Sequence, residues 1–139
     1  MDEVTVVGAG PVGCTLSILL ARRGHPISVL ERRPDLRRVR LDEGRSINLA
    51  LSLRGLSARE SVGLKERVLA RSVPMLGRTI HSDGGVAFQP YGSGDQRLHS
   101  ISRHDLNATL LDAAERSGVT FEFGRRVDGY DFPHRRLSI

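Results

Sequence analysis

The sequence is poor in several residue types, and each shortage limits what the protein can be. Tryptophan is missing, aromatic residues make up 4% of the chain, and Cys14 is the single cysteine. One cysteine cannot form an internal disulfide framework, and it is compatible with a reducing cytoplasm. No apolar run approaches the ~18 residues of a membrane-spanning helix, and the run Val4–Val7 is too short for a signal peptide. We therefore expect a cytoplasmic protein with no membrane partner in these residues.

Lysine is nearly absent as well. The net charge is +5, and Lys65 is the only lysine among 21 basic residues. The arginines are spread from Arg22 to Arg136, whereas a nucleic-acid surface would gather basic residues on one face beside a recognisable motif. We interpret the bias as compositional, with a few arginines serving as anion ligands, and expect no nucleic-acid partner.

The length of 139 residues suits one domain, and the chain is 39% hydrophobic with 15 glycines, as expected of a loop-rich globular protein. The last residues, Arg135–Ile139, read as a strand in progress. We therefore expect residues 1–139 to be the N-terminal part of a larger domain whose downstream part is absent.

Residues 1–35 follow the pattern of a βαβ unit. Val4–Val7 is a β-branched run typical of a buried parallel strand, and a glycine-rich turn at Gly8–Gly13 comes after it. Apolar residues at helical spacing lead from there to Gly24, a good residue for a helix end, and Ile27–Glu31 reads as the next strand. The sequence thus predicts an α/β fold with a parallel sheet and a right-handed crossover.

The remaining elements are predicted from periodicity and turn signals. We expect a helix over Leu53–Leu69 that is interrupted near Gly63, and an extended segment at Leu98–Ser102. A further helix should run from an N-cap at Asp105 to Glu115. Three strand predictions complete the chain: a hairpin around Asp83-Gly84-Gly85, a strand at Val119–Phe123, and a closing hairpin from Val127–Phe132 and Leu137–Ile139.

The turn has the dinucleotide-binding pattern G-x-G-x-x-G. Gly8 permits the tight turn, Gly10 lets a pyrophosphate approach the backbone, and Gly13 lets the helix pack closely. Free amides and the helix dipole favour phosphate there, and Pro11 suits the first helical turn. Glu31, at the end of the next predicted strand, can accept hydrogen bonds from both hydroxyls of an adenosine ribose. The pattern therefore predicts a dinucleotide site.

This fingerprint, the glycine pattern with Glu31, does not by itself decide which dinucleotide binds. The negative charge of Glu31 disfavours a ribose 2′-phosphate, which argues against NADP at this site. Arg32 and Arg33 weaken that argument, because arginines can receive such a phosphate. NAD and FAD fit the fingerprint equally well.

Motifs further along the chain carry a family resemblance. They are the block Arg45–Ser52 (Arg-Ser-Ile-Asn-Leu-Ala-Leu-Ser), the segments Pro74–His81 and Gln89–Gly92, and the stretch from Ser100–Arg103 through Leu106-Asn107 to Leu110–Glu115. From Val4 to about Val127 the chain resembles the kynurenine 3-monooxygenase family of single-component, FAD-dependent aromatic hydroxylases. The block Arg45–Ser52 is its most specific part.

The resemblance implies a Rossmann-like, GR2-type FAD-binding fold, with β-rich substrate-side strands at about residues 72–102. It implies FAD as cofactor and NADPH as a transient co-substrate. Reduced flavin would react with O2 to a C4a-hydroperoxide, which hydroxylates L-kynurenine to 3-hydroxykynurenine in tryptophan degradation and NAD biosynthesis. The protein would supply position and exclusion of water. The family's downstream Asp-Gly and Gly-Asp motifs are not recognisable, so we expect these residues alone to be inactive.

The resemblance also assigns residues to the site. Arg78 and Tyr91 match the pair that holds the substrate carboxylate, a role that suits a planar guanidinium and a neutral phenol donor. No catalytic side chain and no metal ligand is implied. The positions matching cofactor contacts are Gly8, Gly10, Val12, Gly13, Glu31, Arg33, Arg45, Ala50, Arg103 and Val127.

Plainer interpretations and other functions stay open at this point. Arg103 could support the cap of the following helix, Tyr91 could be an ordinary strand aromatic, and Arg45 could be a solvated loop charge. The alternatives for the whole protein are another aromatic hydroxylase, an NAD-linked dehydrogenase, or a non-catalytic nucleotide-binding module. A bound yellow chromophore would separate the first from the second.

Overall fold

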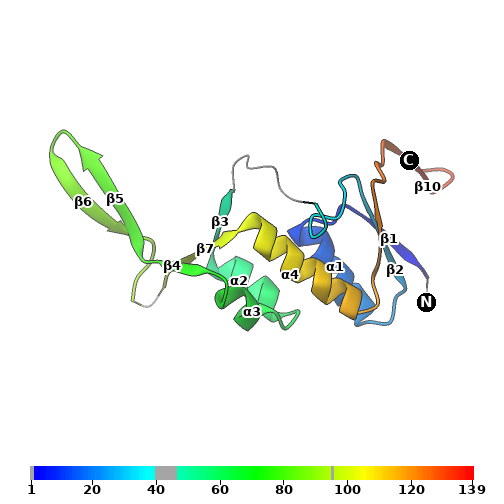
Figure 1. The fold of residues 1–139 in the computed structure, drawn as a ribbon, viewed down its shortest axis with the longest axis horizontal. Coiled ribbons are helices and arrows are strands. Elements are labelled where there is room, and N and C mark those ends of the chain that lie inside the picture. Colours follow the sequence, from blue (N-terminus) through cyan, green and yellow to red (C-terminus); the bar gives the residue numbers. More distant parts are fainter. Residues whose placement is uncertain (1, 40–46, 95) are drawn as a thin grey trace. The chain divides into compact units, whose positions relative to one another are not determined.

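The computed structural model describes residues 2–39, 47–94 and 96–139. The chain forms two compact units (Figure 1). Unit 1 comprises Met1–Gly44 with Asn107–Ile139, and unit 2 comprises Arg45–Leu106.

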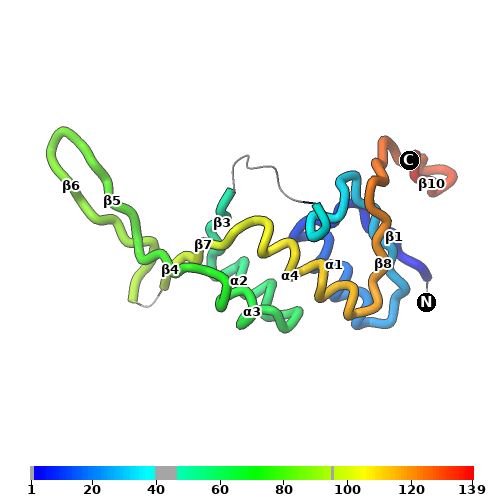
Figure 2. Tube along the Cα trace, in the orientation of Figure 1, coloured from blue at the N-terminus to red at the C-terminus, as the bar shows by residue number. Residues whose placement is uncertain are grey.

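Unit 1 contains the predicted parallel sheet. Its strands are β1 (Val4–Val7), β2 (Ile27–Glu31) and β8 (Thr120–Phe123), in the order β1-β2-β8. Both pairings are parallel. Figure 2, coloured along the sequence, shows that β1 and β8 come from opposite ends of the chain. The α/β class and the parallel sheet are thus confirmed.

The first crossover of unit 1 is the helix α1 (Pro11–Ala21), between β1 and β2. Its side chains Cys14 and Ile18 are fully buried, as is Val29 in the central strand. The Cys14 thiol donates a 3.4 Å hydrogen bond to the Ala9 carbonyl. Gly24 follows the helix with a φ of 87°, the left-handed conformation that its missing Cβ permits.

Unit 2 is built on an antiparallel sheet in the order β3-β7-β4. The strands are β3 (Asn48–Leu51), β7 (Leu98–Ser102) and β4 (Val73–Met75). The predicted helical stretch is two helices, α2 (Leu53–Glu60) and α3 (Lys65–Leu69). The break comes where it was expected, because Gly63 adopts a φ of 70°. Leu56, Val62, Val68 and Ile101 are buried in this unit.

The predicted hairpin is present in unit 2. Strands β5 (Gly77–Ser82) and β6 (Gly85–Pro90) pair antiparallel, and Ser82 lies opposite Gly85, so Asp83 and Gly84 form a two-residue turn. Figure 1 shows the hairpin, in green, extending from the rest of its unit. Nearly all of its residues are exposed.

One helix boundary was predicted wrongly. Helix α4 runs over Arg103–Arg116, so Asp105 lies in its first turn and is not its N-cap. The Asp105 amide donates a 3.4 Å hydrogen bond to the Ser102 hydroxyl. Serine and aspartate cap helices about equally well, so residue type alone could not choose between them. The closing hairpin is present in unit 1 as β9 (Gly129–Asp131) and β10 (Arg136–Ser138).

None of the helices in the described part of the chain combines the length and the apolar character needed to cross a bilayer.

Candidate functional site

The glycine-rich turn shows a separate physical requirement at each of its three glycines. Gly8 has a φ of 99°, a conformation that other residues rarely adopt. A Cβ on Gly13 would overlap the carbonyl oxygen of Gly8. A Cβ on Gly10 would meet nothing within 4 Å, so the space in front of this residue is open. These are the three roles that the fingerprint predicts: a tight turn, close packing of the helix, and room for a pyrophosphate.

The start of α1 provides donors beside this open space. The N-cap is Gly10, which has no side chain to cap the helix amides. Pro11 follows it, and no acidic residue lies in the first turn. The helical ladder begins with the 3.0 Å bond from the Cys14 amide to the Gly10 carbonyl. The amides of Val12 and Gly13 therefore have no acceptor within the helix, and the helix dipole is positive there. Val12 is 81% exposed, so this end of the helix is accessible. The donor set fits a phosphate group.

Glu31 connects the glycine-rich turn to the segment after β2. Its Oε2 accepts a 2.7 Å hydrogen bond from the Ala9 amide, and its Oε1 accepts a 2.9 Å bond from the Arg33 amide. A carboxylate offers about four acceptor positions, so two remain for the hydroxyls of a ribose. Glu31 is half-buried at the carboxyl end of the central strand.

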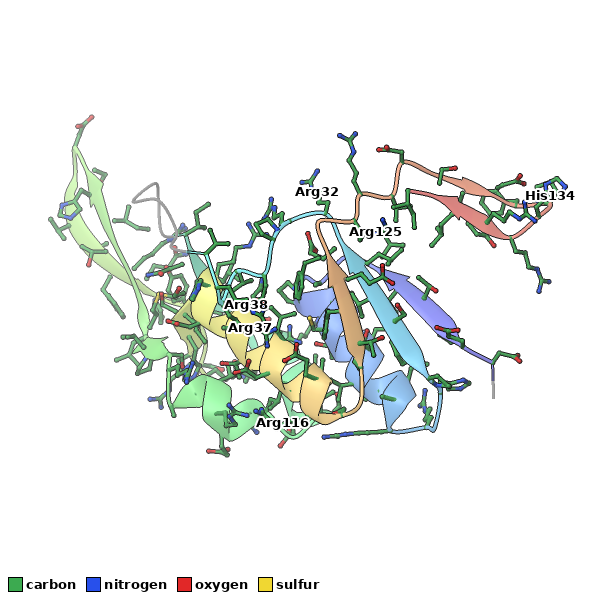
Figure 3. The ribbon with its side chains drawn as sticks, turned by 45° about the vertical axis from the view of Figure 1, so that its right-hand side comes forward. Arg32, Arg37, Arg38, Arg116, Arg125 and His134 are labelled. Carbon is green, nitrogen blue, oxygen red and sulfur yellow. The ribbon has the colours of Figure 1, made fainter. Side chains whose placement is uncertain are left out.

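The carboxyl ends of β2 and β8 are joined by backbone hydrogen bonds. The Arg125 amide donates to the Glu31 carbonyl at 2.9 Å, and the Gly124 amide donates to the Arg33 carbonyl at 3.2 Å. Figure 3 shows Arg32 and Arg125 at this edge of unit 1. Val127 is half-buried two residues further on, and the Arg33 side chain is exposed. The turn, Glu31, Arg33 and the segment leading to Val127 thus lie at the edge where α/β sheets bind ligands.

An ionic cluster that the sequence analysis missed joins the segment after β2 to α4 in unit 1. The Arg37 guanidinium is 2.7 Å from Asp35, 2.9 Å from Asp112 and 2.7 Å from Glu115. Arg37 and α4 lie side by side in Figure 3. The cluster attaches the segment that follows Glu31 and Arg33 to the helix.

Hydrogen bonding in this cluster shifts the titration of its members. The guanidinium of Arg37 bonds to both Asp35 and Glu115, and it holds the pKa of each carboxyl below its usual value. The bonds to Glu115 and then to Asp35 raise the pKa of Arg37 above its ordinary value. Asp35 is only 7% exposed, so its charge depends on this partner. Only the i,i+3 spacing of Asp112 and Glu115 hinted at the cluster, and it did not point to Arg37.

The substrate-side candidates lie on one face of the β5–β6 hairpin. Arg78 is directly opposite Gln89, and the Tyr91 amide donates a 3.0 Å bond to the Leu76 carbonyl, which continues the same ladder. Side chains alternate across a strand, so Gln89 and Tyr91 share the face of Arg78. Arg78 and Tyr91 are therefore diagonal neighbours, a relation in which long side chains can interact.

Three further observations concern this pair in unit 2. The Arg78 Nε donates a 2.8 Å hydrogen bond to the Gln89 Oε1, a contact the sequence analysis did not anticipate. Tyr91 is 41% exposed. It also lines an open depression of about 390 Å³ together with Ser52, Leu53, Arg54, Gln96, Arg97 and Leu98.

The other predicted cofactor contacts are only partly described. Ala50 is an exposed residue of β3, opposite Ser100 of β7. Arg103 is exposed as the first residue of α4, and its amide donates a 3.1 Å hydrogen bond to the Ile47 carbonyl. Ala50 and Arg103 thus belong to adjoining parts of unit 2. Arg45 lies outside the described residues. In the described ranges no group of three or more histidine, cysteine, aspartate or glutamate residues could hold a metal ion.

A family model described as "FAD binding domain" matches residues 1–132. The chain belongs to this family of FAD-binding domains, and its cofactor is FAD. The family thereby decides between the two dinucleotides that the fingerprint left open.

The chain is also similar to individual proteins that carry a more particular name. It is 52% identical to the kynurenine 3-monooxygenase of Myxococcus xanthus over 99% of its length, which covers 30% of that protein. It is 41% identical to the kynurenine 3-monooxygenase of Caenorhabditis elegans over 100% of its length, covering 31% of that protein. The chain thus spans about three-tenths of the length of these relatives.

Solved structures of two oxygenases share the fold. The tetrameric form of 2-methyl-3-hydroxypyridine-5-carboxylic acid oxygenase superposes with a TM-score of 0.81 at 20% identity, over 99% of this chain and 35% of that one. p-Nitrophenol 4-monooxygenase from Pseudomonas putida gives a TM-score of 0.76 at 19% identity, over 94% of this chain and 34% of that one. At this level of identity the likeness shows the fold alone.

Proposed function

We propose that this chain supplies the N-terminal, FAD-binding part of a monooxygenase that hydroxylates L-kynurenine, using NADPH as reductant and O2 as oxidant. The observation that carries the proposal is the 52% identity to a kynurenine 3-monooxygenase along 99% of the chain. The common face of Arg78 and Tyr91 supports it, because kynurenine is an amino acid with a carboxylate to bind. A cytoplasmic location remains a prediction from cysteine usage.

The pyrophosphate and the adenosine of FAD would be held by the glycine-rich turn and the residues near Glu31. The open space at Gly10 and the amides of Val12 and Gly13 suit the pyrophosphate. Glu31 would accept hydrogen bonds from the ribose hydroxyls while it keeps its two backbone donors. Arg33 and Val127 would contact the adenosine.

Ala50 and Arg103 are proposed as further contacts of FAD on the family resemblance, and both are exposed in adjoining strand and helix segments. Arg45 is proposed on the same ground. Bound FAD supplies the activation of oxygen, and the chain's own residues position the reactants and exclude water.

Arg78 and Tyr91 would bind the substrate carboxylate. A guanidinium can donate two parallel hydrogen bonds to a carboxylate, and the neutral phenol adds a third donor without a second charge. The register of the hairpin supports the pairing, because Arg78 lies opposite Gln89 and Tyr91 follows two residues after Gln89. Orientation by the carboxylate would leave the aromatic ring of the substrate to face the flavin.

The test uses the full-length protein that carries this chain. It should purify with a yellow chromophore that absorbs at about 450 nm, as expected of a bound flavin that carries the chemistry. L-Kynurenine should stimulate NADPH oxidation and yield 3-hydroxykynurenine. The amine that corresponds to kynurenine without its carboxylate should stimulate NADPH oxidation poorly. A flavoprotein that ignores kynurenine but hydroxylates another aromatic acid would contradict the assigned substrate. A colourless protein that does not oxidise NADPH, either with kynurenine or with another aromatic acid, would contradict the monooxygenase class.

A further inference from the structure

A hydrogen bond between two side chains fixes the orientation of Arg78 on the hairpin. Arg78 of β5 and Gln89 of β6 are direct cross-strand partners, and the 2.8 Å bond runs from the Arg78 Nε to the Gln89 Oε1. A guanidinium can only donate, so the oxygen of the Gln89 amide must face it. The bond therefore occupies one edge of the guanidinium with a neutral acceptor that belongs to the chain itself.

This contact restricts how Arg78 can bind an anion. A free guanidinium can receive a carboxylate along its Nε–Nη edge or across its two terminal Nη groups. Gln89 occupies the Nε, so the two Nη groups remain as the bidentate site. The bond also limits the rotamers of a long side chain that would otherwise lose ~2 kcal/mol of conformational entropy on binding. Arg78 is thus oriented before a ligand arrives.

The direction of the face links this contact to Tyr91. Gln89 and Tyr91 are two residues apart on the same side of the ladder, and Arg78 lies opposite Gln89. The cross-strand pairs on either side of Arg78, Gly77 with Pro90 and Thr79 with Phe88, lie on the opposite face. Gln89 is therefore the residue that both touches the guanidinium and lies on the face of the phenol.

We propose that Gln89 is a positioning residue that holds the Arg78 guanidinium with its two Nη groups available to the substrate carboxylate. The inference rests on the proposed function of Arg78 and Tyr91 in carboxylate binding. Gln89 acts through Arg78 and takes no part in the chemistry. Its loss should weaken binding of the substrate and leave the turnover of bound substrate nearly unchanged.

The experiment measures L-kynurenine affinity by calorimetry in the full-length, FAD-loaded protein without NADPH. The Gln89→Leu variant keeps the approximate size and removes the acceptor, so the dissociation constant should rise about 3- to 10-fold, the range of one net hydrogen bond. KM should rise in parallel with the dissociation constant, and kcat should stay within about twofold of the parent value. Gln89→Glu should weaken binding further, because its charge competes with the substrate carboxylate for the guanidinium.

Three comparisons separate positioning from a structural role. Thr79→Val, on the other face of the same strand, should leave the affinity unchanged. The amine lacking the carboxylate should bind Gln89→Leu and the parent equally well. In an Arg78→Ala background, Gln89→Leu should have no further effect, because the two residues act as one unit.

Equal weakening for the amine, or additive losses in the double variant, would show that Gln89 only stabilises the hairpin and would overturn the inference. A weakened Arg78→Ala with an unchanged Gln89→Leu would overturn the inference and leave the proposed function intact. An Arg78→Ala variant with unaltered kynurenine affinity would overturn both.

Discussion

Alanine at Gly10 and at Gly13 should separate cofactor binding from folding. At Gly10 a Cβ meets nothing within 4 Å, and the backbone, with φ −77° and ψ −179°, is one that alanine adopts without strain. The added methyl should change the free energy of unfolding by less than ~1 kcal/mol, since its effects on the unfolded chain and on the N-cap oppose each other. The same methyl would fill the space proposed for the pyrophosphate, so the affinity for FAD should fall at least about tenfold.

At Gly13 the result should differ, because the Cβ meets backbone. The carbonyl oxygen of Gly8 lies where the methyl would go, and Gly8 cannot move without changing a turn that already has a φ of 99°. Overpacking of this kind costs ~1–3 kcal/mol. We therefore expect Gly13→Ala to lower both the stability of the protein and its affinity for FAD.

The assay pairs urea denaturation of the FAD-free protein with a titration of FAD followed by quenching of flavin fluorescence. Gly55→Ala is the matched control, since Gly55 lies in α2 and its Cβ would meet only the Leu51 side chain, at 3.4 Å. That variant should bind FAD like the parent and be equally stable or up to ~1 kcal/mol more stable. Parent-like FAD affinity in Gly10→Ala would refute the assignment of the pyrophosphate to this turn.

Three further predictions concern charged residues. Arg37→Leu should lower the free energy of unfolding by ~1–2 kcal/mol at neutral pH. Because Arg37 lowers the pKa of Asp35 and Glu115, its stabilisation is complete above the pKa values of these carboxyls in the unfolded chain. It is lost as the pH falls through their pKa values in the folded protein. Urea titrations of both proteins at pH 7 and at about pH 3 measure this loss. An equal difference in stability between the parent and the variant at both pH values would contradict the prediction. Glu31→Gln should reduce FAD affinity about tenfold, because charged acceptors bind hydroxyls more strongly, as a fluorescence titration would measure; unchanged affinity would remove Glu31 from the ribose site. Arg78→Lys keeps the charge but loses the planar fork, so kynurenine affinity measured by calorimetry should fall ~5-fold or more, and a lysine variant equal to the parent would argue against bidentate binding.

Local patterns predicted most of the helices and strands correctly, because residues close together in the sequence determine where these elements form. The βαβ unit follows from a β-branched run, three glycines and an acidic strand end, and the hairpin follows from Asp83-Gly84 between extended runs. The break near Gly63 and the strand β8 were also expected. The N-cap of α4 was misplaced because two good capping residues, Ser102 and Asp105, stand three positions apart.

Contacts between distant residues were beyond such reasoning. Nothing local marks Arg37 as the partner of Asp112 and Glu115, because the chain must first place the segment after β2 beside α4. Likewise, Gln89 was noticed only as part of a family motif. Its bond to Arg78 depends on the register of β5 and β6, and a shift by one residue would send it to the other face.

The sequence by itself determined that the protein binds a dinucleotide, because the turn and its helix are local structures whose glycines and free amides are specified by neighbouring residues. Motif content along the chain indicated which dinucleotide, and the family match confirmed FAD. Only the tertiary structure decided which distant groups meet: the Ala9 amide with Glu31, Arg37 with the two carboxylates of α4, and Arg78 with the glutamine of the facing strand. The physical reason is that hydrogen bonds and ion pairs need atoms within about 3 Å, and for residues far apart in the chain only strand register and packing set that distance.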